Sequence, residues 1–182
     1  HFVSSLKVII ENINRFYRKN LKKSWRMKDS DGVVLGENYM PLDRVGIYIP
    51  AGTAPLVSSV YMTVLPAKIA GVKRIVLISP PDIRGYINPH ILVVANLLKV
   101  DEIYRVGGAQ GIAALAYGTK TIPKVDKIVG PGNIYVSEAK RQVFGCVDID
   151  MIAGPTELVI IANRHSDPKF IIADIKAQTE HS

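Results

Sequence analysis

Hydrophobic residues near the N-terminus recur at the spacing of one helical face. The steps of three and four residues predict an amphipathic helix over residues 4–20, and its apolar positions are Leu6, Ile9 or Ile10, Ile13, and Phe16 or Tyr17. Two short strand-like runs follow, at residues 25–28 and 33–35. Asp31 and Gly32 end the segment between them, and glycine supplies the positive φ that a tight turn needs. These runs therefore predict a β-hairpin.

From residue 45 the pattern changes to short β-branched runs, each followed by a glycine- or proline-rich turn and an apolar helical run. Polar residues do not alternate along the strand-like runs, which indicates strands buried on both faces, as in a parallel sheet. The sequence therefore predicts a doubly wound α/β fold. The predicted strands are residues 45–49, 74–79, 102–106 and 127–129, and the predicted helices are residues 58–70, 89–98, 112–117 and 134–143.

The last part of the chain predicts one more strand and one more helix. Residues 157–162 are strongly apolar, and Asp167 followed by Pro168 is a favourable helix start. The helix is predicted to run from Pro168 toward Ser182. Gln178 and His181 then share one face, one turn apart.

Composition excludes several classes of protein. The 182 residues are 48% hydrophobic, which suits globular units with a real core. The net charge of +7 is concentrated at residues 18–28. Without interleaved aromatic residues or a nucleic-acid-binding motif, this run predicts a solvated surface and no nucleic-acid partner.

The expected location is the cytoplasm, without a membrane segment. Cys146 is the single cysteine, so no disulfide framework or cysteine metal cluster is expected. The apolar runs are too short to cross a bilayer. The chain starts with His1 and has no signal-peptide pattern, so we expect a trimmed or excerpted start.

Glycine-rich turns follow the predicted strands, where doubly wound sheets bind ligands. The turns at residues 107–111 and 130–133 do not match the G-x-G-x-x-G spacing, and no P-loop lysine pattern is present. From spacing alone, the turns are either structural or phosphate-binding.

Gln178 and His181 are candidate metal ligands on one helical face. Two ligands do not complete a zinc site, so a solvent-facing histidine at a helix end is the alternative. His90 and His165 are expected at the surface, and Glu180 is expected to face solvent or to support a ligand.

Several long motifs make the chain similar to the histidinol dehydrogenase family. They occur in the family's order from about residue 4 to the last residue. The most specific are residues 41–56 (PLDRVGIYIPAGTAPL), 106–110 (VGGAQ), 125–133 (VDKIVGPGN), 138–143 (EAKRQV), 150–157 (DMIAGPTE) and 178–181 (QTEH).

The resemblance implies a fold, a reaction and a set of site residues. The reaction is the oxidation of L-histidinol to L-histidine by two hydride transfers to NAD, in a zinc-dependent homodimer. The fold is a Rossmann-like domain without the glycine fingerprint, inserted into a second α/β domain. The implied contacts are Tyr48, Gln110 and Asn133 to NAD, Thr156 to the substrate in place of the family's usual serine, and Gln178 and His181 to both zinc and substrate.

The resemblance also implies that this chain holds only part of such an enzyme. The family's Glu–His acid–base pair, an aspartate ligand and a further histidine ligand are expected beyond Ser182. Residues 1–44 and 157–182 are then expected to form parts of an incomplete outer domain, and residues 45–156 the NAD-binding domain. We expect no turnover by residues 1–182 alone.

Two other functions are open at this level. A related zinc- and NAD-dependent dehydrogenase could act on another small alcohol, such as a sulfonated diol. A chain without the acid–base pair could also serve as a non-catalytic nucleotide-binding or assembly module. Fold-level resemblance alone does not decide the substrate.

Overall fold

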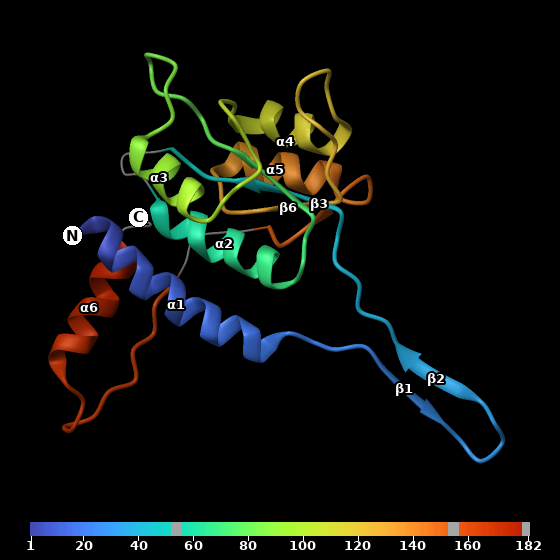
Figure 1. Ribbon diagram of the computed structural model, residues 1–182. Helices are drawn as coiled ribbons and strands as arrows, with labels where there is room; N and C mark the ends of the chain where they lie inside the picture. The colour runs from blue at the N-terminus through green and yellow to red at the C-terminus, as the bar shows by residue number, and fades with distance from the viewer. Residues whose placement is uncertain (52–55, 153–156, 180–182) are drawn as a thin grey trace.

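The N-terminal segment forms a helix and a projecting hairpin. The structure is a computed structural model that describes residues 1–51, 56–152 and 157–179 (Figure 1). The predicted first helix is α1 (Phe2–Asn20), which packs on α2 (Val57–Ile69) and buries Leu6 in the core. The predicted hairpin is also confirmed. Its strands β1 (Trp25–Lys28) and β2 (Val34–Glu37) are antiparallel, exposed and directed away from the rest of the molecule.

The predicted parallel sheet is present, and its strand order is that of a Rossmann-like fold. In the order β5-β4-β3-β6-β7, the chain adds β4 and β5 on one side of β3 and then adds β6 and β7 on its other side. Every neighbouring pair in this sheet is parallel. The doubly wound α/β prediction is therefore confirmed. The strands are β3 (Arg44–Tyr48), β4 (Arg74–Ile78), β5 (Glu102–Tyr104), β6 (Lys127–Val129) and β7 (Asp148–Ile149).

Helices cover both faces of this sheet. On one face lie α2 and α3 (Pro89–Leu97), and on the other lie α4 (Gly108–Tyr117) and α5 (Ile134–Val143) (Figure 1). Successive strand residues point to opposite faces, so Ile47 packs in the α2–α3 core and Tyr48 in the α4–α5 core. This double burial explains why the strand sequences lack polar alternation.

Helix α4 starts four residues earlier than the sequence predicts. The sequence predicts a loop at residues 107–111. In the structure α4 begins at Gly108, after an extended Gly107 at the N-cap. Glycine is acceptable at the cap, and the Gly111 N–H already donates to the Gly107 carbonyl over 3.3 Å. Gln110 therefore lies in the first turn of a helix.

The predicted strand at residues 157–162 is wrong. These residues are exposed and have no regular structure, because no strand in the described ranges pairs with them. The final helix is confirmed as α6 (Pro168–Thr179), and Asp167 caps it by accepting a 2.8 Å hydrogen bond from the Lys169 N–H. None of the described helices has the length and apolar character needed to cross a membrane.

Candidate functional site

A pocket of about 430 Å³ opens at the carboxyl ends of the parallel strands. Its walls come from the segments after β3, β4, β5 and β6, so it lies where the strand order reverses. Open α/β sheets bind their ligands at this position. The lining residues are Tyr48, Pro50, Ala51, Pro80, Pro81, Gly107, Gly108, Gln110 and Asn133.

Tyr48 connects the sheet to the start of α4. Its side chain is the last of β3 and is only 3% exposed, packed in the α4–α5 core. The hydroxyl oxygen accepts a 3.2 Å hydrogen bond from the Gly108 N–H. The phenol O–H can still donate a hydrogen bond at the wall of the pocket.

Gln110 lies at the N-terminal end of α4 and is exposed to the pocket opening. Gly108 has φ +67°, and a Cβ there would lie 2.8 Å from Gln110 Oε1. The missing side chain at Gly108 therefore leaves room for the Gln110 carboxamide. Gly107 provides no side-chain cap, so the partial positive charge of the helix end is presented to this wall.

Asn133 forms the opposite rim and is held by its own helix. It is the N-cap of α5, where its Oδ1 accepts a 3.1 Å hydrogen bond from the Val136 N–H. The cap fixes the orientation of the carboxamide, and the amide nitrogen is its remaining donor.

The polar groups of the pocket are neutral donors. Among the described residues, its lining contains no charged side chain. A phosphate or sugar group bound here would meet the phenol of Tyr48, the amides of Gln110 and Asn133, and the N-terminus of α4. This donor set fits a nucleotide, and the volume is within the range of about 300–1,000 Å³ that is usual for ligand pockets.

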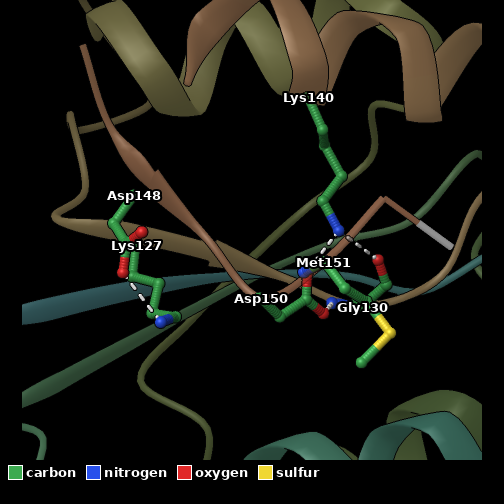
Figure 2. A network of polar contacts seen from close by, with 6 residues as sticks. All are labelled: Lys127, Gly130, Lys140, Asp148, Asp150 and Met151. Carbon is green, nitrogen blue, oxygen red and sulfur yellow. Dashed lines mark hydrogen bonds and ion pairs between the residues drawn. The ribbon is translucent and has the colours of Figure 1, made fainter. Parts of the chain in front are cut away.

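Two residues that the sequence analysis did not single out lie behind this rim. Lys140 is 2% exposed and pairs with Asp150, which follows β7 (Figure 2). Lys140 stands in sequence among the buried positions of α5, which are Val136, Ala139 and Val143. A lysine at a core position of a helix is the signal by which it could have been found.

The other predicted site residues are not in this pocket. Gln178 is half-buried on α6 and does not line it. Thr156, Glu180 and His181 lie outside the described residues. His90 and His165 are exposed, as predicted. In the described part of the chain, no three His, Cys, Asp or Glu residues gather as metal ligands.

The structure defines a Rossmann-like α/β protein with a candidate ligand pocket at the switch point of the sheet. The chain belongs to the histidinol dehydrogenase family, whose model matches residues 1–182. The resemblance in the sequence motifs is therefore confirmed at the level of the family.

Relatives of known name agree with this assignment. Histidinol dehydrogenase of Listeria innocua is 59% identical over 180 residues, and that of Clostridium acetobutylicum is 53% identical. Each match covers 99% of this chain and 42% of the relative. The crystal structure of histidinol dehydrogenase from Elizabethkingia anophelis matches with a TM-score of 0.90 and 43% identity, over 98% of this chain and 42% of that one. The chain thus spans less than half the length of these relatives.

Proposed function

We propose that this chain supplies the NAD-binding part of an NAD- and zinc-dependent enzyme that oxidises L-histidinol to L-histidine through L-histidinal. One observation carries the proposal. Tyr48, Gln110 and Asn133, which the family resemblance assigns to NAD, line one pocket at the switch point of the sheet. They come from the end of β3 and from the starts of α4 and α5, which are far apart in the sequence.

The pocket has groups suited to each part of a dinucleotide. The Tyr48 hydroxyl and the two carboxamides donate hydrogen bonds to ribose or phosphate oxygens, and the N-terminus of α4 favours negative charge. The buried Tyr48 ring and the prolines at residues 50, 80 and 81 form apolar walls that exclude water. NAD, when bound, supplies the hydride acceptor for the oxidation.

The zinc part of the proposal rests on the resemblance. Gln178 offers an amide oxygen on α6, but the described residues do not assemble a ligand set around it. Zinc sites in enzymes usually have three protein ligands. The proposal assigns Gln178 and His181 to zinc and substrate and Thr156 to substrate. It draws the other ligands and the Glu–His acid–base pair from outside this sequence.

The domain division is part of the same proposal. Residues 45–156 would form the NAD-binding domain, and residues 1–44 and 157–182 would belong to an outer domain of a homodimeric enzyme. The parallel sheet from Arg44 to Ile149 supports this division, because the hairpin and residues 157–179 take no part in that sheet.

Binding and turnover test the proposal separately. The purified chain, with its intact mass verified, is titrated with NAD in a calorimeter and then assayed for NADH formation with histidinol and Zn²⁺. We expect saturable NAD binding without turnover. The full-length product of the gene should turn over histidinol, and a sulfonated diol serves as the comparison substrate. Failure of either protein to bind NAD, or turnover by residues 1–182 alone, would contradict the proposal.

A further inference from the structure

An ion pair with a buried lysine lies directly behind the Asn133 rim of the pocket. Lys140 is only 2% exposed, and its Nζ makes an ion pair with Asp150 Oδ1. The same Nζ donates a 3.0 Å hydrogen bond to the Gly130 carbonyl. Figure 2 shows Lys140 reaching from its helix toward the loop that contains Gly130.

Asp150 completes the contacts with the same glycine. Its Oδ2 accepts a 2.8 Å hydrogen bond from the Gly130 N–H, and its Oδ1 accepts one of 2.6 Å from the Met151 N–H. The Asp150 N–H donates to the Ile128 carbonyl over 3.1 Å, which holds Asp150 beside β6. The pair therefore binds both backbone polar groups of Gly130 (Figure 2).

Gly130 is the point where this pair meets the pocket. It lies three residues before Asn133 and has φ +110°. A Cβ at Gly130 would overlap the carbonyl oxygen of Tyr48, so the loop packs directly on the end of β3. A shift of Gly130 would displace Asn133 relative to Tyr48.

We propose that Lys140 and Asp150 are positioning residues for the nucleotide pocket. Their ion pair fixes the peptide groups of Gly130 and so holds the Asn133 carboxamide at the distance from Tyr48 that the nucleotide requires. The inference deepens the proposed NAD binding and rests on it.

A more exposed ion pair between β6 and β7 provides a comparison. Lys127 Nζ and Asp148 Oδ2 are 2.7 Å apart, and their side chains are 31% and 54% exposed. This pair joins the amino-terminal ends of β6 and β7, and neither residue lines the pocket. Figure 2 shows it apart from the Lys140–Asp150 pair. Burial of the Lys140 ammonium has a desolvation cost, which an apolar side chain would avoid. Its specific contacts with Gly130 are what apolar side chains could not provide.

The test compares two lysine-to-methionine variants in the full length that the gene encodes. Lys140→Met should weaken NAD binding at least about tenfold, because it releases the Gly130 carbonyl. Lys127→Met, the matched control, should stay within about twofold of the wild type. NAD affinity is measured by calorimetry, and near-UV circular dichroism verifies folding. Asp150 is 27% exposed and can be hydrated in the Lys140→Met variant, so this variant should fold.

A double variant separates positioning from stability. Lys140→Met with Asp150→Leu leaves no unpaired charge beside the loop, although it also removes the acceptor of the Gly130 and Met151 N–H groups. We expect a folded protein with a cooperative melting transition and with NAD affinity still at least about tenfold weaker. Wild-type affinity in either folded variant would overturn the positioning role alone. Absence of NAD binding by the wild type would overturn the proposed function and this inference together.

Discussion

Gly130 is a position where both the backbone conformation and the available space favour glycine. Its φ of +110° is a backbone conformation that side chains rarely adopt, and a Cβ would overlap the Tyr48 carbonyl oxygen. Gly85 has a similar φ of +84°, but no atom lies within 4 Å of its would-be Cβ. Comparing substitutions at the two glycines therefore separates the free-energy cost of backbone strain from the cost of steric overlap.

Replacement of these glycines by alanine should have unequal effects. Gly85→Ala should lower the free energy of unfolding by about 1 kcal/mol, from backbone strain alone. Gly130→Ala should lower it by about 3 kcal/mol or more, because the overlap with backbone adds to the strain. Urea unfolding of both variants measures the difference. Equal losses would mean that the Gly130 loop moves away from β3 without cost.

The Tyr48 hydroxyl gives a second prediction for a single residue. Tyr48→Phe keeps the buried ring and removes the acceptor of the Gly108 N–H. We expect about tenfold weaker NAD binding with a loss of only about 1 kcal/mol in unfolding free energy. Tyr39→Phe is the control, since the Tyr39 hydroxyl bonds Glu37 on the hairpin. If both variants bind NAD like the wild type, Tyr48 makes no contact through its hydroxyl.

Two helices of the sheet domain start with the same cap, and only one of them borders the pocket. The N-cap of α3 is Asn88, whose side chain accepts from the His90 N–H over 2.9 Å. The N-cap of α5 is Asn133, at the rim. An asparagine cap thus does not line the pocket in one helix and has a proposed binding role in the other.

Alanine at these two caps should separate the two roles. Asn88→Ala and Asn133→Ala should each lower the free energy of unfolding by about 1 kcal/mol. Only Asn133→Ala should also weaken NAD binding, by about tenfold. Chemical unfolding and calorimetric titration of both variants provide the measurements. A comparable affinity loss in Asn88→Ala would point to general loosening of the domain.

Helix α5 also contains an ion pair whose effect depends on pH. The Glu138 carboxylate accepts hydrogen bonds from Arg141 and Gln142, and they lower the pKa of Glu138 from 4.5 to about 2. A lowered pKa in the folded state means stabilisation that is present above pH 4.5 and is lost as the pH falls through about 2. The contribution is small, because the pair is exposed.

Glu138→Gln should therefore lower stability at neutral pH and have little effect in strong acid. The difference in urea midpoint between variant and wild type should shrink as the pH falls from 4.5 toward 2. High salt should also reduce the difference at neutral pH, because it screens the charges. A difference that does not depend on pH would assign the effect to packing.

For the whole molecule, the buried apolar side chains of the described residues all belong to the two cores beside the parallel sheet. The two cores on the faces of the sheet contain fully buried side chains such as Ile128, at 0% exposure. Outside the sheet, large apolar side chains are exposed on the hairpin and in residues 157–179, with Ile161 at 96%. Such exposure suits the proposed outer domain, which other parts of a longer protein would cover.

An exposed and a buried isoleucine should therefore differ in how much their substitution changes the free energy of unfolding. In the chain of 182 residues, Ile161→Asp should change the free energy of unfolding by less than about 0.5 kcal/mol. Ile128→Ala should lower it by about 2–5 kcal/mol, since it leaves a cavity in the core. In the full-length protein Ile161→Asp should become destabilising as well. Similar losses for both variants in the short chain would show that residue 161 is packed there.

Local sequence was sufficient for most elements because their information is local. Helical spacing predicted α1, and the turn at residues 29–32 predicted the hairpin. The lack of polar alternation in residues 45–49 and 74–79 indicated a parallel sheet. The same reasoning failed where structure depends on a neighbour. Residues 157–162 have a strand-like composition, but a strand needs a hydrogen-bonding partner that composition does not supply.

The sequence by itself determined the fold class and, through its motifs, the family. Only the tertiary structure decided the strand order and the meeting of Tyr48, Gln110 and Asn133 in one pocket, because parallel strands bring distant loops together at one edge. It also decided the environment of Lys140. A lysine is stable in a core only when an opposite charge and hydrogen-bond acceptors reach it. Asp150 and Gly130 reach Lys140 through the pairing of β6 with β7, which its own helix does not specify.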